Sequence, residues 1–228
     1  MNMAQDAKLL TLAEQAYRQI QTAIVYGDLP AGSKILEAEL AKTYGISRGP
    51  LREAIHRLEG QKLLQRTAHV GTRVVSLSEQ QLIELYQIRA NLEGLACRLT
   101  AEKRDADVVA QLQAILQLHE KDENFQAGKG YYLQEKDDDF HYCIIHYSGN
   151  ALLKKMLCDE LYHIIRMYRI QFSNTPHRPP RALFEHQQIL AAIAEGDGAL
   201  AEILMQRHIM ASCRNIQQHL PHVSQDKH

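Results

Sequence analysis

Residues 40–59, LAKTYGISRGPLREAIHRLE, decide the fold of the N-terminal third of this chain. Gly45 can end a short helix in the left-handed conformation, and Ser47 can cap the helix that follows. Pro50 lies in the first turn of this second helix, where a missing amide hydrogen costs little. The apolar residues of the second helix recur at helical spacing (Leu51, Ala54, Ile55 and Leu58). The stretch therefore predicts two helices joined by a tight turn.

Further elements are expected on both sides of this helix pair. Residues 11–26 have apolar side chains at helical spacing, and GDLPAG at residues 27–32 ends that helix. Two β-prone runs, residues 63–66 and 72–75, follow the pair and are separated by a short tip. The chain is therefore expected to begin with a winged helix-turn-helix, made of helices over residues 11–26, 37–44 and 48–61 and a hairpin over residues 63–75.

The predicted second helix of the pair carries the chemistry of a DNA reader. A helix in this position can enter the major groove, and the residues near its N-terminus read base edges. Arg48 and Arg52 lie four residues apart and therefore on one face, while Gly49 lets the backbone approach the sugar-phosphate. The hairpin tip would bring polar residues to the adjacent minor groove (His69, Thr72 and Arg73, with Gly71 in the tip). A winged helix that binds protein is the alternative, but it leaves both arginines unexplained.

Charge is distributed unevenly along the chain. Residues 1–76 hold ten Lys/Arg and seven Asp/Glu, a balance of +3, whereas residues 77–228 hold sixteen and twenty, a balance of −4. A basic N-terminal part suits a polyanion such as double-stranded DNA, although a charge asymmetry of this size is also common on ordinary solvated surfaces.

Composition also excludes several classes of protein. The chain has no run of eighteen apolar residues and no basic start followed by an apolar block, so neither a membrane span nor a secretory signal is expected. The four cysteines are scattered without a CxxC pair, which favours buried thiols in a reducing compartment. We therefore expect a cytoplasmic protein of two domains, residues 1–76 and 77–228, that does not bind membranes.

The second predicted domain is all helical. Ser78 can cap its first helix, and no strand-like alternation occurs after it. The fold class expected for the whole chain is therefore mainly α, with a winged helix-turn-helix followed by a helical bundle. The bundle helices are expected at residues 78–100, 106–126, 131–148, 151–172, 181–195 and 198–220.

Four residues of the predicted bundle suit a divalent metal ion. Asp137 and His141 are spaced i, i+4, which places them on one face of a helix, one turn apart. His186 shares a helix face with apolar residues and so points toward the core, and His208 lies in the last helix. Three imidazoles and one carboxylate suit zinc, with nickel or manganese as alternatives. Spacing alone leaves open the reading that these are ordinary core histidines. Asp138 and Asp139 lack the i, i+4 relation to His141 and are expected to be solvated.

Residues 40–59 resemble the signature of the GntR family of bacterial transcription regulators, in which LA..LGVSR.PVREAL.RLE recurs. GDLPAG at residues 27–32 resembles the family's turn before its second helix. The resemblance implies that Arg48 and Arg52 contact the operator and that the wing tip enters the minor groove. Ala38 stands where some members carry a further DNA-contacting arginine, so that contact is not carried over.

The C-terminal part resembles the FCD ligand-binding domain of the FadR subfamily, a bundle of about six or seven helices. Its motifs D..FH, EH..I..AI..GD and M..H are matched by residues 137–141, 185–197 and 205–208. The resemblance implies that a metal held by the four matching residues (Asp137, His141, His186 and His208) binds a small carboxylate together with a buried arginine. Candidate effector contacts are Arg89, Arg166, Arg169 and Asn215. For Arg89, an ion pair with Glu93 on its own helix is the alternative.

These observations predict a homodimeric transcription regulator, expected to be a repressor, and not an enzyme. Residues 125–132 and 166–173 are similar to regulators of propionate breakdown by the methylcitrate cycle, which implies 2-methylcitrate or another tricarboxylate as effector. Two alternatives stay open: a metal-responsive regulator in which the cation is the signal, and a metal-dependent hydrolase. The hydrolase needs an acid or base beside the metal that no motif supplies, and it leaves the N-terminal third without a role.

Overall fold

The structure is a computed structural model that describes residues 10–121, 139–172 and 178–220. The chain divides into two compact units. The first contains the residues up to Ser76 together with Glu160–Met167, and the second contains Leu77–Asp159 and the residues from Tyr168 onward. Among the described helices, none combines the length and the hydrophobicity that crossing a membrane requires.

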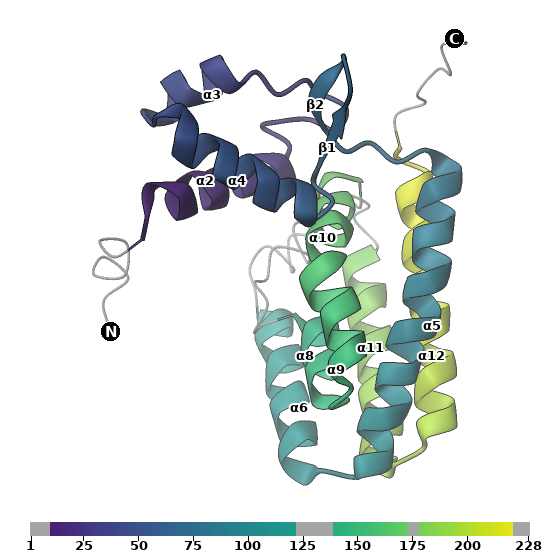
Figure 1. Cartoon of the computed structure of the whole chain (residues 1–228). Helices are drawn as coiled ribbons and strands as arrows, with labels where there is room; N and C mark the ends of the chain where they lie inside the picture. The colour runs from purple at the N-terminus through teal and green to yellow at the C-terminus, as the bar shows by residue number, and fades with distance from the viewer. Residues whose placement is uncertain (1–9, 122–138, 173–177, 221–228) are drawn as a thin grey trace. The chain divides into compact units, whose positions relative to one another are not determined.

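The first unit begins with a three-helix core (Figure 1). Thr11 caps the first helix by accepting a hydrogen bond from the Glu14 amide at 3.1 Å, and Gly45 ends the second with a φ of 63°. The apolar stripe of the third helix is fully buried, as its periodicity predicts. Ser47 precedes this helix, but its side chain makes no capping hydrogen bond. The helices are α2 (Leu12–Tyr26), α3 (Glu37–Tyr44) and α4 (Arg48–Gly60).

A two-stranded antiparallel hairpin completes the winged helix-turn-helix. Strand β1 (Leu64–Thr67) pairs with β2 (Gly71–Val74), and Thr67 lies opposite Gly71. Gly71 has a φ of 100°, a backbone conformation that a residue with a Cβ rarely adopts.

The hairpin corrects one expected DNA contact. Along β2 the side chains alternate, so that Thr72 is buried and Arg73 is exposed. The carbonyl of Thr72 also accepts a hydrogen bond from the Ile35 amide at 2.8 Å. Thr72 therefore faces the core of the unit, and the expectation that it reaches DNA is wrong. Arg73, one residue further, is on the solvent side.

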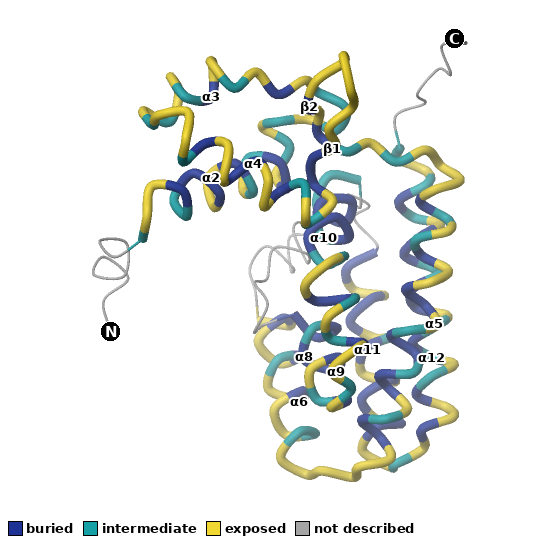
Figure 2. Tube along the Cα trace, viewed as in Figure 1, coloured by how far each residue is buried: buried dark blue, intermediate teal, exposed yellow. Residues whose placement is uncertain are grey.

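The second unit is built from helices, which confirms the predicted mainly-α fold class. Helices α5 and α12 lie side by side along much of their length (Figure 1), and α11 packs against α12, α6 and α5. Buried residues recur between exposed ones along each of these helices (Figure 2). The elements are α5 (Glu79–Lys103), α6 (Ala106–Lys121), α8 (Phe140–Tyr147), α9 (Ala151–Lys154), the π-helical turn η2 (Lys155–Glu160), α11 (Arg178–Glu195) and α12 (Gly198–Gln217). Helix α10 (Tyr162–Phe172) is divided between the units, and its part from Tyr168 onward belongs to this one.

A glycine permits the close approach of α5 and α12. A Cβ on Gly94 would lie 3.0 Å from Cγ of Gln206, tighter than ordinary van der Waals contact. The absence of a side chain at this position lets the two helices approach closely. Side chains of the two helices then meet, as Arg98 of α5 and Glu202 of α12 do in an ion pair.

Three expected helices differ from the structure, and one of them, α11, begins at Arg178 instead of Arg181. The helix that carries His141 begins at Phe140, because Asp139 has extended backbone and caps it, accepting hydrogen bonds from the amides of His141 and Tyr142. The helix expected over residues 151–172 is interrupted by η2, in which Leu157 and Cys158 are buried. Neither Gly nor Pro occurs within residues 151–172, so local sequence does not signal this interruption.

Candidate functional site

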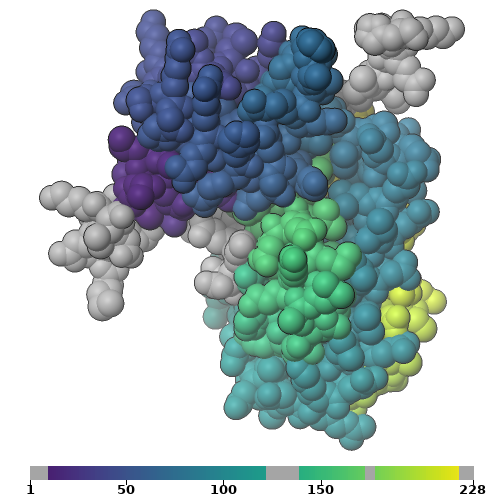
Figure 3. Space-filling model, in the orientation of Figure 1, coloured from purple at the N-terminus to yellow at the C-terminus, as the bar shows by residue number. Residues whose placement is uncertain are grey.

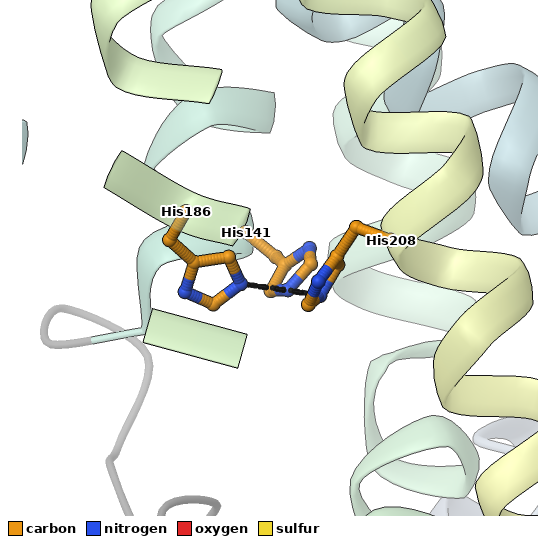
Figure 4. Close-up of side chains that lie close together, drawn as sticks. All are labelled: His141, His186 and His208. Atoms are coloured by element: carbon orange, nitrogen blue, oxygen red, sulfur yellow. Dashed lines mark hydrogen bonds between the residues drawn. The ribbon is translucent and has the colours of Figure 1, made fainter. Parts of the chain in front are cut away.

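Three buried histidines meet inside the second unit. His141 comes from α8, His186 from α11 and His208 from α12 (Figure 4). The distances between their Nε2 atoms are 3.1 Å for His186 and His141, 3.1 Å for His186 and His208, and 3.2 Å for His208 and His141. All three ring nitrogens therefore converge on one point.

Local structure aims each ring at this point. The Asp139 cap fixes the start of α8 and places His141 in its first turn. His186 lies on the buried face of α11, and its ring stacks on Phe140 with a centroid distance of 4.5 Å. His208 lies on the buried face of α12 beside Met205 and Ile209.

Two glutamates contact the Nδ1 atoms of two of the histidine rings, on the side opposite the converging Nε2 atoms. Oε2 of Glu93 lies 2.6 Å from Nδ1 of His141, and Oε2 of Glu185 lies 2.7 Å from Nδ1 of His208. Each glutamate also pairs with an arginine of its own helix, Glu93 with Arg89 and Glu185 with Arg178. Since a carboxylate only accepts hydrogen bonds, Nδ1 of each of these two histidines carries the hydrogen.

Burial and charge set the protonation of the cluster. Burial lowers the pKa of His208 to about 3 and that of His186 well below its ordinary value, and it also lowers the pKa of His141. Burial by itself would raise the pKa values of Glu93 and Glu185, but their cationic and hydrogen-bonding partners outweigh it and hold both at about 2. At neutral pH the histidines are therefore neutral and the glutamates ionised.

The three neutral histidines cannot all form hydrogen bonds with one another through their Nε2 atoms. His141 and His208 carry their hydrogens on Nδ1, so their Nε2 atoms present lone pairs. Only His186 can place a hydrogen on Nε2, and that leaves at most one hydrogen for three contacts. Tetrahedral zinc with Zn–N distances of about 2.0–2.1 Å has N···N separations of roughly 3.3–3.4 Å, close to the 3.1–3.2 Å found here. The arrangement can therefore hold a cation such as zinc, nickel or manganese.

The protonation of this cluster predicts an acid-sensitive fold. Below pH 6.5 an unfolded chain protonates His208, whereas the folded chain keeps it neutral down to its lowered pKa of about 3. The free energy of unfolding of the metal-free chain should therefore fall as pH drops from 7 to 5, with a slope that approaches about 1.4 kcal/mol per pH unit from His208 alone, and the lowered pKa of His141 adds to the loss. Below pH 4.5 the loss continues through Glu93 and Glu185.

Urea unfolding at pH 7, 6 and 5 measures this slope. Replacing His208 with glutamine removes one titrating group and should make the slope shallower. A free energy of unfolding that is constant over this range would contradict the protonation described for the cluster.

Two predicted effector residues lie among the buried charges of the second unit. Arg89 is only 2% exposed and pairs with Glu93, as its alternative reading held. Its Nη1 atom has no hydrogen-bond partner within the part of the chain that is described. Nη1 of Arg169 lies 3.1 Å from Oδ2 of Asp139. The expectation that Asp139 is solvated is therefore wrong, because Asp139 is buried, caps α8 and pairs with Arg169.

The remaining predicted site residues are not gathered with the histidines. Asp137 lies outside the described residues, and because α8 begins at Phe140, that helix gives no support to the i, i+4 argument for it. Arg166 belongs by its contacts to the first unit, where its Nη2 donates to the Tyr26 hydroxyl at 3.2 Å. Asn215 is half-buried on α12, two turns beyond His208.

Sequence reasoning missed Glu93, Glu185 and Arg178 as parts of the cluster. Glu93 follows Arg89 by one turn, and Glu185 follows Arg178 by two turns, so both pairs share a helix face. Pro179 and Pro180 suggested that α11 begins after them, which hid Arg178. The contacts that join the two glutamates to His141 and His208 cross between helices and leave no local signal.

The candidate DNA surface lies in the first unit. Arg48, Gly49 and Arg52 are exposed, and side chains of α3 and α4 protrude from this face of the unit in the space-filling view (Figure 3). Nε of Arg52 lies 3.0 Å from Oε2 of Glu37. On the wing, Arg73 is exposed and donates to the carbonyl of Gly32 at 2.9 Å, while His69 lies at the exposed tip with a φ of 63°. Apart from Thr72, the residues predicted to contact DNA are thus accessible to it.

Comparison with known proteins gives matches in both units. Residues 12–74 match the model described as "Bacterial regulatory proteins, gntR family", and residues 84–211 match the FCD domain. The chain is 30% identical over 213 residues to the HTH-type transcriptional regulator YdhC of Bacillus subtilis (strain 168), covering 93% of this chain and 92% of that protein. It is 28% identical over 210 residues to the HTH-type transcriptional repressor GlaR of Escherichia coli (strain K12), covering 89% and 94%.

A solved structure shows the same fold. Escherichia coli McbR/YncC matches with a TM-score of 0.75 at 21% identity, covering 92% of this chain and 99% of that one.

Proposed function

The chain belongs to the GntR family of bacterial transcription regulators and carries the FCD domain typical of FadR-like members, and from this premise we propose that a small carboxylate, bound at a metal centre, controls its affinity for operator DNA. The matched domains and relatives are transcription regulators and not enzymes. We propose that this regulator is a repressor that acts in the cytoplasm as a homodimer, with two winged helices on a palindromic operator.

The observation that carries this proposal is the convergence of three buried Nε2 atoms inside the second unit, of which those of His141 and His208 both present lone pairs. These two lone pairs, 3.2 Å apart in a buried site, repel one another unless a hydrogen-bond donor or a cation lies between them. A divalent cation would supply that charge, with coordination positions left for oxygens of a ligand. Zinc suits three imidazoles best, with nickel and manganese as alternatives, and Asp137 is the proposed fourth ligand.

Unused buried donors support an anionic effector. Nη1 of Arg89 and Nε of Arg178 are buried and have no hydrogen-bond partner among the described residues. A buried donor without a partner costs about 1–3 kcal/mol, so a ligand that accepts from it gains affinity. Arginine pairs with carboxylates in a bidentate geometry. The effector we propose is therefore a small carboxylate, with tricarboxylates such as 2-methylcitrate as the first candidates, and Arg169 and Asn215 as further contacts.

Operator binding in the presence and absence of metal tests the proposal. An operator is first selected from random duplexes with the full-length protein, and its affinity is then measured by fluorescence anisotropy. Metal-free protein and protein reloaded with Zn²⁺ are each titrated with 2-methylcitrate, citrate and smaller dicarboxylates. We expect a carboxylate to weaken operator binding by about 5- to 150-fold, the usual range of allosteric coupling, and only in the zinc-loaded protein.

The same measurement separates the proposal from its rival. If Zn²⁺ alone changes operator affinity and no carboxylate adds to the change, the cation is the signal and the chain is a metal-responsive regulator. If 2-methylcitrate and citrate have no effect while a smaller carboxylate does, the tricarboxylate assignment is wrong and the metal-dependent scheme stands.

A further inference from the structure

Two arginine–glutamate pairs are built against the outer side of the histidine cluster. On α5, Arg89 holds Glu93, whose other oxygen is 2.6 Å from Nδ1 of His141. On α11, Nη1 of Arg178 lies 2.7 Å from Oε2 of Glu185, and the same oxygen is 2.7 Å from Nδ1 of His208. The two arrangements come from different helices and act on different histidines, yet both follow the order arginine, carboxylate, imidazole.

The physical effect of such a carboxylate on an imidazole is specific. A neutral imidazole has one N–H, and a carboxylate at Nδ1 keeps the hydrogen there and leaves a lone pair on Nε2. The hydrogen bond also fixes the rotation of the ring and makes Nε2 a stronger donor of electrons to a metal. The arginine in turn balances the charge of the buried carboxylate, which would otherwise be costly to desolvate.

The third histidine is oriented in another way. The ring of His186 stacks on Phe140 at 27° between planes and meets the ring of His141 edge-on at a centroid distance of 4.9 Å. Ring packing of this kind fixes orientation without selecting which nitrogen carries the hydrogen. The two glutamate contacts described above act on His141 and His208.

We infer that Glu93 and Glu185 are positioning residues for the metal centre: each holds one histidine in the tautomer and rotation that turn its Nε2 toward the shared point. The inference rests on the proposed metal centre and adds which residues outside the metal-binding histidines set its affinity. Arg89 and Arg178 hold the two carboxylates in place through their ion pairs, and Nη2 of Arg178 also lies 3.4 Å from the carbonyl oxygen of His208. In this scheme neither glutamate binds the cation itself.

Metal titration of isosteric variants tests the inference. Glu93→Gln and Glu185→Gln keep side-chain size but lose the charge and can turn an amide N–H toward Nδ1. Metal-free full-length protein is titrated with Co²⁺, followed by its visible absorption, and with Zn²⁺ in competition with a chromogenic chelator. We expect each variant to bind both metals about 10- to 100-fold more weakly than the unmodified chain and to show an altered Co²⁺ spectrum.

Glu202→Gln is the matched control. Glu202 lies on α12 and pairs with Arg98 of α5, so it is also an ion-paired glutamate between helices of the second unit. Its substitution should leave metal affinity and the Co²⁺ spectrum unchanged. Thermal unfolding of each metal-free variant separates a loss of metal affinity from a loss of folding, and Glu185, with a side chain 17% exposed, provides the more tolerant position if Glu93→Gln fails to fold.

The outcomes test the positioning role of the two glutamates separately from the proposed metal centre. If the unmodified chain takes up neither Co²⁺ nor Zn²⁺, the metal centre itself is wrong, and the inference falls with it. If the unmodified chain binds metal and both glutamine variants bind it within twofold with the same spectrum, the positioning role is overturned while the metal centre stands.

Discussion

His141→Ala should lower the affinity of the chain for Zn²⁺ by roughly a thousandfold, because it removes one of three converging imidazoles from a site that needs them together. In the scheme proposed above, it should also abolish the effect of a carboxylate on operator affinity. Operator binding in the absence of effector should persist, since His141 lies in the second unit and the DNA-reading residues lie in the first. Isothermal titration with Zn²⁺ and anisotropy with labelled operator measure the two properties.

His146→Ala is the control for this substitution. His146 lies five residues further along α8 but is exposed, so its removal costs a histidine from the same helix without touching the cluster. It should leave Zn²⁺ affinity and the carboxylate response intact. A carboxylate response that survives His141→Ala would show that the effector does not depend on the metal centre.

Arg52→Ala should weaken operator binding by about 1–3 kcal/mol, roughly 5- to 150-fold, and joint replacement of Arg48 should weaken it further. Both side chains are exposed near the start of α4, where helices of this type meet base edges. The loss should be smaller on unrelated duplexes, since a base contact contributes to specificity and a phosphate contact does not. Anisotropy with operator and with scrambled duplex at one fixed salt concentration measures both.

Arg18→Ala provides a closely matched control. Arg18 pairs with Glu14 as Arg52 pairs with Glu37, and the two arginine side chains are 62% and 61% exposed. Exposed pairs of this kind contribute little to stability, so neither substitution should unfold the unit. Only Arg52→Ala should affect operator binding. Simultaneous loss of Zn²⁺ affinity in the Arg52 variant would contradict the assignment of the two activities to separate units.

Local signals predicted the first unit closely. Helix α3 has the predicted bounds because Gly45 ends it through its own backbone, and α4 starts where Ser47 and Pro50 indicated. The face of Thr72 was mistaken because GTRV is too short to reveal its alternation, so only pairing with β1 and with Ile35 shows which side is inward.

The cluster in the second unit was predictable only in part. Spacing and helix faces single out the three histidines but leave open that they are ordinary core residues, and the family resemblance is what favours a metal site. What surrounds them depends on packing between helices: Glu93 meets His141 across 48 residues, and Asp139 is buried because Arg169 reaches it from α10. Such contacts have no period in the sequence, and the interruption at η2 has no Gly or Pro to mark it.

The double engagement of Arg89 has a consequence for engineering. One guanidinium faces Glu93 through Nε, while its Nη1 has no hydrogen-bond partner among the described residues and is, in the scheme proposed above, a contact for the effector. A mutational library that varies Arg89 to obtain a biosensor with new ligand selectivity would at the same time loosen the support of His141. Selectivity and cofactor retention would then change together in every clone, so a screen should hold this position constant and diversify residues that have no partner in the cluster.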